Sequence, residues 1–287
     1  MDSLRKALSG DTPVRAPLVL NPLMAKMAEA AGFPALYLGG GATGYAKVAL
    51  EANLNLTEMV QAGADIRAVT ALPLILDAAA GWGDPMHMVR TIGMAEGAGF
   101  AAIEIEDQLL PKRAHHHIGI EHMVPQELME AKVREAVRAR RDPDFLIIGR
   151  TNGVRASDMD DALRRAEGYR KAGADLLLLS PRNPEEARRI GERLGPPLMH
   201  ICRPGGLAAM GLTLAEMHAL GIRIIVDPVT PLLAAYEAMG AIYQELAGGF
   251  AVTDRSPEDW EDLQERMHST IGLEALLAIE KETVERD

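Results

Sequence analysis

The sequence predicts an α/β fold, a closed (β/α)8 or TIM barrel, followed by additional helices. Eight short apolar segments alternate with segments of helical periodicity along the chain. Most of these apolar segments lack the alternation of a half-exposed strand, so we expect parallel strands buried on both faces. Such a barrel takes roughly 250 residues, and this chain has 287. An open doubly wound sheet is the alternative, but no GxGxxG segment follows the first expected strand.

Each expected strand is a short apolar run that is followed by a turn and a helical segment. The strands are expected at residues 17–21, 35–40, 72–77, 101–106, 145–150, 174–180, 197–202 and 222–227. Several helical segments end at a glycine shortly before the next strand, where a residue with positive φ closes a helix. These glycines are Gly32, Gly99, Gly173 and Gly221.

Further helical segments follow the eighth strand. We expect a single barrel domain over residues 1–287, in which residues 230–287 form a C-terminal helical extension. Apolar residues recur at helical spacing in this extension, so its helices need a partner surface. That surface is either the flank of the barrel or another subunit.

Composition limits the classes of function. A net charge of −11 argues against a nucleic-acid partner, because such binding usually needs a basic face. The single cysteine, Cys202, excludes an intrachain disulfide. No apolar run is long enough to span a membrane, and the first residues lack the apolar core of a signal peptide. We therefore expect a soluble, cytoplasmic protein that acts on small molecules.

In a TIM barrel the reactive groups lie at the C-terminal ends of the strands. Asp77 and Glu106 end two adjacent expected strands, about 4.8 Å apart, so both could share one Mg2+ or Mn2+ ion directly or through water. The alternative for each acid is that it caps the following helix. Arg150 ends the next strand and could bind a substrate carboxylate as a planar fork, or could form a structural ion pair with one of the acids.

The segment after the fourth expected strand, "EDQLLPKRAHHHIGIEH", is long for a connection to a helix, which is typical of a functional lid. It carries two cations and three consecutive histidines: Lys112, Arg113, His115, His116 and His117. Consecutive side chains of an extended loop alternate in direction, so all three histidines cannot bind one ion. We expect residues 107–122 to be a mobile lid whose cations and one histidine complete the site on closure. The alternative is a solvated loop.

Four segments resemble, in order, motifs of the isocitrate lyase / phosphoenolpyruvate mutase superfamily. They are "MAEAAGFPALYLGGGA", "LPLILDAAAGWGDPMHMVRTI", "IEIEDQLLPKRAHH" and "IIGRTNG". They match that family's helix, strand and Ser/Gly-rich loop, its "DxDxGYG", its "IEDQ..PKRCGH" and its "ARTDA". The resemblance implies a (β/α)8 barrel, with magnesium held by Asp77 and, through water, by Glu106. It also implies that the last barrel helix swaps between subunits of a homotetramer.

The same resemblance implies how a small carboxylate substrate is bound. Loop amides after the second strand, together with Arg150, would hold the carboxylate of a 2-oxo or 2-hydroxy acid. The substrate-binding candidates are Tyr37, Gly39, Gly40, Gly41, Ala42, Asn152 and His200. The catalytic candidates are Arg150, His116, Arg113 and Lys112.

Departures from the motifs direct the functional prediction. Ala79 replaces the second aspartate of "DxD", and Ala114 replaces the cysteine with which the lyases protonate the enolate. Ser157 and Pro204 stand where lyases usually carry glutamates. These changes argue against an isocitrate or methylisocitrate lyase. They favour a magnesium-dependent carbon–carbon lyase that decarboxylates an oxaloacetate-like acid, because decarboxylation needs no base for a substrate hydroxyl.

Three alternatives stay open. One is retro-aldol cleavage of the methylisocitrate or dimethylmalate type, with His115, His116 or His200 in place of the cysteine as the acid. Of these, His116 aligns with the histidine of the family's "KRCGH". The second alternative is phosphonate chemistry of the phosphoenolpyruvate mutase type. The third is an inactive barrel retained as a binding or scaffold protein.

Overall fold

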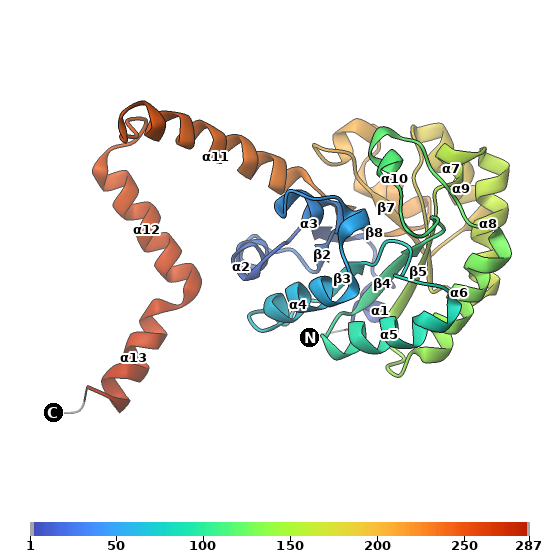
Figure 1. Ribbon diagram of the computed structural model, residues 1–287, viewed down its shortest axis with the longest axis horizontal. Helices are drawn as coiled ribbons and strands as arrows, with labels where there is room; N and C mark the ends of the chain where they lie inside the picture. The colour runs from blue at the N-terminus through green and yellow to red at the C-terminus, as the bar shows by residue number, and fades with distance from the viewer. Residues whose placement is uncertain (1–2, 286–287) are drawn as a thin grey trace. The chain divides into compact units, whose positions relative to one another are not determined.

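The computed structural model describes residues 3–285 (Figure 1). The chain divides into two compact units, Met1–Leu232 and Leu233–Asp287. The first unit contains the strands and the helices between them. The second contains most of α11 (Thr230–Gly249), and all of α12 (Pro257–Ile271) and α13 (Leu273–Thr283).

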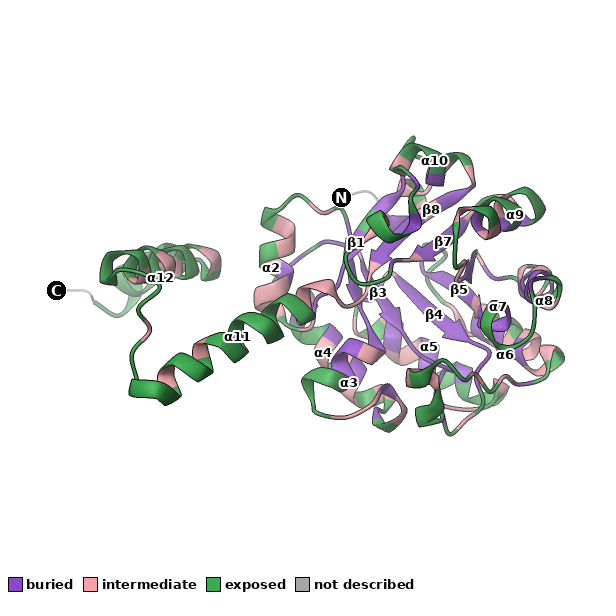
Figure 2. Ribbon diagram, turned by 90° about the horizontal axis from the view of Figure 1, so that it is seen from above, coloured by how far each residue is buried: buried purple, intermediate pink, exposed green. Residues whose placement is uncertain are grey.

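Eight parallel strands within residues 3–285 form the centre of the first unit (Figure 2). They are β1 (Val14–Pro17), β2 (Leu36–Leu38), β3 (Leu74–Asp77), β4 (Ala102–Glu106), β5 (Leu146–Thr151), β6 (Leu176–Leu179), β7 (Leu198–Ile201) and β8 (Ile222–Asp227). Their order is β1-β8-β7-β6-β5-β4-β3-β2, and a parallel bridge between Leu18 and Tyr37 joins the two end strands. The predicted (β/α)8 barrel is confirmed.

The first strand lies earlier than the sequence predicted. Val14 to Pro17 pair with β8, whereas the prediction began at Pro17. The apolar residues that follow Leu18 leave the ladder, although Val19 N still donates to the Tyr37 carbonyl at 2.9 Å. Asn21 then caps the next helix by accepting from Met24 N at 2.9 Å. Apolar character alone does not distinguish a strand from the buried turn behind it.

Helices cover the outside of the barrel. The barrel helices are α2 (Pro22–Ala30), α3 (Gly40–Ala46), α4 (Leu56–Arg67), α5 (Met88–Gly97), α6 (Gln126–Ala139), α7 (Gly153–Ala156), α8 (Met159–Lys171), α9 (Pro184–Leu194) and α10 (Leu214–Ala219), after a short α1 (Leu4–Ala7). Four 3-10 turns complete the set: η1 (Glu51–Asn53), η2 (Pro85–His87), η3 (Ala114–Ile118) and η4 (Leu207–Met210). The glycines expected to close helices, Gly32, Gly99, Gly173 and Gly221, all have positive φ.

Two apolar clusters, one inside the barrel and one outside it, show to which side each strand side chain points. Ile75, Ile148 and Met199 belong to a cluster inside the barrel, whereas Leu74 and Leu198 belong to the cluster between strands and helices. Successive strand side chains point to opposite faces. Residues two positions apart therefore share a side, which determines the strand-end residues that enter the barrel mouth.

Many apolar side chains of the helices in the second unit are exposed in this chain. No residue of α11, α12 or α13 is buried. Tyr236 is 75% exposed, Met239 49% and Ile279 56%. The expected exchange of a helix between subunits stays a prediction. Within residues 3–285, no helix combines the length and apolar character needed to cross a bilayer.

Candidate active site

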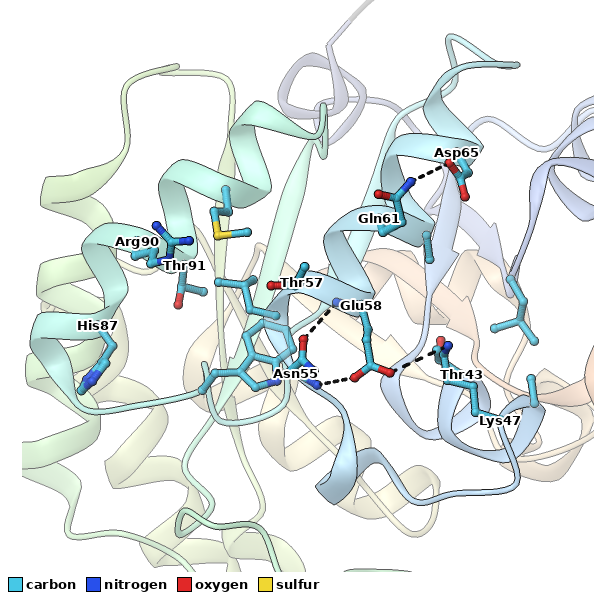
Figure 3. A pocket seen from close by; sticks show the side chains of 16 residues that line it. Thr43, Lys47, Asn55, Thr57, Glu58, Gln61, Asp65, His87, Arg90 and Thr91 are labelled. Atoms are coloured by element: carbon cyan, nitrogen blue, oxygen red, sulfur yellow. Dashed lines mark hydrogen bonds and ion pairs between the residues drawn. The ribbon is translucent and has the colours of Figure 1, made fainter.

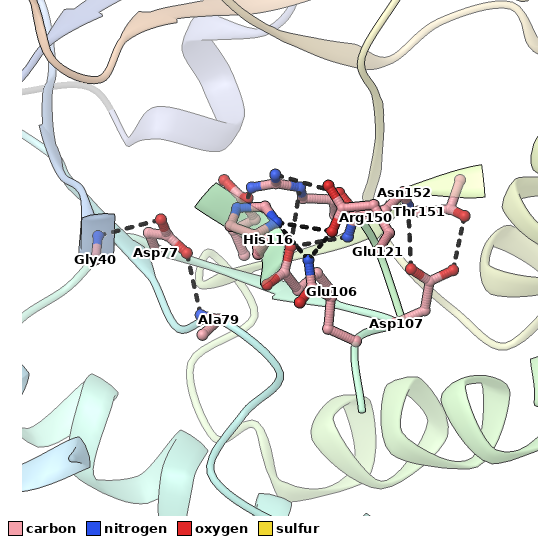
Figure 4. A network of polar contacts seen from close by, with 12 residues as sticks. Gly40, Asp77, Ala79, Glu106, Asp107, His116, Glu121, Arg150, Thr151 and Asn152 are labelled. Carbon is pink, nitrogen blue, oxygen red and sulfur yellow. Dashed lines mark hydrogen bonds and ion pairs between the residues drawn. The ribbon is translucent and has the colours of Figure 1, made fainter. Parts of the chain in front are cut away.

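The C-terminal ends of β3, β4 and β5 bring the polar candidates together (Figure 4). Asp77 is the last residue of β3 and is only 8% exposed. Its Oδ2 accepts from Gly40 N at 3.1 Å, and its Oδ1 accepts from Ala79 N at 3.0 Å. Ala79 adopts a positive φ of 46°, so the turn after β3 is held in an unusual backbone conformation around this carboxylate.

The glycines after β2 form a helix start and not the loop that the sequence predicted. Gly39 is the N-cap of α3, and Gly40, Gly41 and Ala42 form its first turn. A Cβ at position 40 would collide with the side chain of Glu51, so any other residue there would displace that carboxylate. The close approach places the α3 backbone directly beside the acids of the site.

The acid level with Asp77 is Glu104, which the sequence analysis missed. In the strand register Asp77 pairs with Glu104, and Glu106 pairs with Arg150. Glu104 is 1% exposed, and it accepts from Arg150 Nη1 at 2.7 Å and from Tyr37 Oη at 3.0 Å. Alternation within "IEIE" was the available signal, because residues two apart on a strand share one face.

Glu106 and Arg150 form the middle of the site. Glu106 is 1% exposed, and its Oε1 lies 2.6 Å from Lys112 Nζ. Its Oε2 accepts from Asn152 Nδ2 at 2.9 Å and lies 3.3 Å from Arg150 Nε. Arg150 therefore bridges Glu104 and Glu106, while its Nη2 has only a 3.4 Å contact to Asn152 Oδ1. In this chain both acids pair with Arg150; its Nε faces Glu106 at ion-pair distance without a hydrogen bond, and Nη2 makes only the long bond to Asn152.

Glu51 is a further acid that sequence reasoning did not find. It lies in η1, is 7% exposed, and forms an ion pair with Lys112. Its Oε1 is buried and has no hydrogen-bond partner among residues 3–285. No motif marked this residue, because it reaches the site only through the fold of the segment between α3 and α4.

The site holds more buried acidic than basic side chains. Four carboxylates, those of Glu51, Asp77, Glu104 and Glu106, surround two cations, Lys112 and Arg150. Burial and the charge of Asp77 raise the pKa of Glu51 to about 8 and that of Glu104 to about 7. Burial would also raise the pKa of Glu106, but Arg150 and Lys112 outweigh it and hold that pKa well below its ordinary value.

The segment expected to be a lid folds back on itself over the barrel mouth. Leu109 N donates to the His122 carbonyl at 2.7 Å, and Val124 N donates to the Asp107 carbonyl at 2.8 Å. Lys112 is buried within the site, whereas Arg113 is exposed. The two cations are thus separated. The motion of this segment and the role of Arg113 stay predictions.

Asp107 anchors the base of the lid, and sequence reasoning assigned it no role. It is fully buried (0% exposed) and accepts from Thr151 Oγ1 at 2.7 Å, from Asn152 N at 3.0 Å and from Tyr169 Oη at 2.7 Å. These bonds tie the end of β4 to β5 and α8. Asn152, itself 2% exposed, thereby presents its side chain to Glu106.

The three consecutive histidines lie in the 3-10 turn η3, not in an extended loop, and each has a different partner. His115 Nδ1 lies 3.0 Å from Nε2 of His122, and His117 Nδ1 lies 3.2 Å from Tyr45 Oη. His116 Nδ1 lies 2.7 Å from Glu121 Oε2. As predicted, the three do not converge on one point.

His200 lies on the helix side of β7, away from the barrel mouth. Met199 and Ile201 pack against the interior cluster, and Leu198 and Cys202 belong to the outer one. Alternation therefore turns His200 outward. It is 3% exposed, its Nδ1 has no partner within residues 3–285, and burial lowers its pKa to about 4. This placement speaks against the predicted substrate contact.

Cavity size does not locate the site. A cavity of about 910 Å³ lies in the helix layer, between α3, α4 and α5 (Figure 3). Lys47, Glu58, Asp65 and Arg90 are among its lining residues. The acids of the barrel mouth are not.

Comparison with known proteins assigns the family. Over residues 4–247 the sequence matches the family described as phosphoenolpyruvate phosphomutase. The chain belongs to the phosphoenolpyruvate phosphomutase family. Membership confirms the resemblance carried by the four sequence motifs.

Named members and structural neighbours of the phosphoenolpyruvate phosphomutase family differ in activity. The 2,3-dimethylmalate lyase of Eubacterium barkeri is 34% identical over 250 residues, which cover 85% of this chain and 84% of the lyase. A phosphonopyruvate hydrolase, solved in complex with oxalate and Mg2+, superposes with a TM-score of 0.84 at 27% identity, covering 98% of both chains. An oxaloacetate acetylhydrolase, in complex with its product oxalate, superposes with a TM-score of 0.78 at 28% identity, covering 94% of this chain and 96% of that one.

Proposed function

We propose that this protein is a carbon–carbon lyase that depends on Mg2+ or Mn2+ and acts on a small 2-oxo or 2-hydroxy di- or tricarboxylate. The reaction that the site suits best is decarboxylation of an oxaloacetate-type acid through an enolate. The observation that carries the proposal is the buried cluster in which Asp77, Glu104 and Glu106 lie with Arg150 and Lys112 at the barrel mouth. The neighbours named for oxaloacetate and for dimethylmalate support a carboxylate substrate.

The residues of the site fit a divalent cation. Their free oxygens belong to carboxylate groups, which are the hard ligands that Mg2+ and Mn2+ prefer. The cluster has two more acids than cations, and Glu51 Oε1 is buried without a partner among the described residues. No three His, Cys, Asp or Glu side chains of residues 3–285 surround one point. Lys112, Arg150 and backbone amides are bonded to several of the carboxylate oxygens. Asp77 would hold the ion and Glu106 would hold one of its waters.

When bound, the ion would polarise the 2-oxo group of the substrate. The chain's own groups would do the rest. Arg150, through Nη2, and the first-turn amides of Gly41 and Ala42 would orient the carboxylates. The carbon–carbon bond to the departing carboxylate then breaks and carbon dioxide leaves. The electron pair of the broken bond stays on the remaining fragment and forms the enolate. Lys112 and Arg150 stabilise that negative charge, and His116 returns a proton to carbon.

A second candidate reaction is retro-aldol cleavage, which the similarity to 2,3-dimethylmalate lyase favours. It additionally needs a base for the substrate hydroxyl. Turnover of a panel of 2-oxo and 2-hydroxy di- and tricarboxylates and of phosphonopyruvate, with Mg2+ and then with chelator, separates the candidates. We expect metal-dependent loss of carbon dioxide from oxaloacetate. Metal binding without turnover of any acid would indicate a scaffold and contradict the proposal.

His116→Ala is expected to lower kcat by at least about tenfold, the smaller effect of a positioned acid. The melting temperature should change little, because η3 has no fully buried residue and Glu121 keeps Gln108 and Arg155 as partners. Steady-state kinetics and a thermal melt measure the two effects. Arg113→Ala is the companion variant, and an equal loss would mean that this exposed side chain folds over the bound dianion. Normal turnover of both variants would refute the catalytic lid.

The C-terminal helices are expected to bury their apolar faces in a homo-oligomer, most simply a tetramer. Exposed apolar side chains recur at helical spacing on two of these helices. They are Leu233, Tyr236 and Met239 on α11, and Leu276 and Ile279 on α13. Sedimentation velocity should show the oligomer at micromolar concentration, and Tyr236→Glu should shift it toward the monomer while Glu237→Gln does not. A stable, active monomer of the unaltered protein would contradict this expectation.

A further inference from the structure

Besides Asp107 at its base, the lid contains a second acid whose side chain is enclosed. The side chain of Glu121 is 0% exposed, although it belongs to a segment whose neighbours face solvent. It has three partners on three parts of the chain. Its Oε2 accepts from Gln108 Nε2 near the base of the lid and from His116 Nδ1 in η3 at 2.7 Å, and its Oε1 forms an ion pair, without a hydrogen bond, with Arg155 Nη1 in α7 at 3.1 Å. Glu121 thus joins the lid to the wall of the barrel.

The contact with a carboxylate favours one tautomer of His116. A carboxylate only accepts, so the 2.7 Å bond to Glu121 requires the proton on Nδ1. Gln108 Nε2 also lies 2.7 Å from Nδ1, but it cannot donate to a nitrogen that already carries a proton. Its hydrogens go to Glu121 instead, with which it is also in contact. Nε2 of His116 therefore remains the ring nitrogen without a partner among residues 3–285.

Of the histidines considered, His116 is the one that interacts with the acids of the site. Figure 4 draws it beside Arg150 and Glu106, and its charge is one of the influences on the carboxyl of Glu106. The other histidines lack this combination. His115 and His117 are engaged by His122 and Tyr45, and His200 faces the helix layer.

We propose that Glu121 is a positioning residue that holds His116 with Nδ1 protonated, so that Nε2 exchanges protons with the substrate. This inference rests on the proposed function. In the imidazolium form both ring nitrogens carry a proton. The Nε2–H bond breaks, its proton joins the carbanion carbon of the enolate, and neutral imidazole with Nδ1–H stays bound to Glu121. The arrangement supplies the proton that Ala114, in place of a cysteine, cannot give.

The kinetic test compares Glu121→Gln with Glu127→Gln, the same change at an exposed acid at the start of α6. We expect Glu121→Gln to lower kcat at least about tenfold with KM changed less than about threefold, and the control to match the unaltered enzyme. In a His116→Ala background, Glu121→Gln should cause no further loss of kcat, because it acts through the missing ring. An equal loss in both backgrounds would mean that Glu121 is only structural and would overturn the proposal.

A spectroscopic measurement tests the same inference without turnover. In protein labelled with 15N-histidine, and assigned by comparison with His116→Ala, the neutral His116 ring should show the Nδ1–H tautomer, and Glu121→Gln should mix it with Nε2–H. An Nε2–H ring in the unaltered protein would overturn the proposal. If no carboxylate is turned over while the Nδ1–H tautomer depends on Glu121, the proposed reaction fails and the positioning role stands.

Discussion

Replacement of Asp77 by alanine is expected to abolish the metal-dependent activity of this protein. Asp77 ends β3 at the barrel mouth, and in the proposed site it is the carboxylate that binds the ion itself. Without it the remaining acids are largely neutralised by Lys112 and Arg150, so affinity for Mg2+ should fall together with kcat. Calorimetric titration with Mg2+ and turnover in the presence of Mg2+ measure the two quantities separately.

The barrel should survive this change but lose measurable stability. Asp77 accepts hydrogen bonds from Gly40 N and Ala79 N, and each contributes about 1.5 kcal/mol or somewhat more, because the acceptor is charged. Asp77→Asn keeps acceptor capacity and separates the loss of charge from the loss of these bonds. Asp84→Ala, at an exposed acid in the same connection, is the matched control. Unchanged Mg2+ binding and full activity of Asp77→Ala would remove Asp77 from the metal site.

The second large effect is expected at Arg150. Its guanidinium contacts Glu104 through Nη1 and Glu106 through Nε, which leaves Nη2 toward Asn152 and the mouth of the barrel. A lysine retains the charge but has one nitrogen, which cannot bridge two acids and also bind a substrate carboxylate. We expect Arg150→Lys to weaken transition-state binding by about 2 kcal/mol or more, a loss of about 30-fold in kcat/KM.

Two further measurements distinguish substrate binding from a structural ion pair at Arg150. A substrate that lacks one carboxylate should lose much less kcat/KM on Arg150→Lys, because the missing contact no longer exists in either enzyme. Arg164→Lys, at an exposed ion pair on α8, provides the control for a change of cation alone. A lower melting temperature with unchanged kcat/KM for every substrate would show that Arg150 is structural.

Much of the architecture could be predicted from the sequence because it depends on local pattern. The apolar runs located β2 to β8 closely, and Gly32, Gly99, Gly173 and Gly221 marked the helix ends at which φ is positive. A strand end also places its last residue at the barrel mouth, whatever its neighbours are. The pattern of each strand was therefore enough to select Asp77, Glu106 and Arg150 as candidates. The start of β1 was wrong, because a buried turn and a strand have the same composition.

The contents of the site depended on contacts between residues far apart in the chain. Strand register places Glu104, and not Glu106, level with Asp77. The fold of η1 brings Glu51 to Lys112, across 61 positions of sequence. Alternation along β7 turns His200 outward, and the folding of the lid encloses Glu121 beside His116. Periodicity is a property of one segment, whereas register and loop packing minimise the free energy of several segments at once, so only the folded barrel specifies which side chains meet.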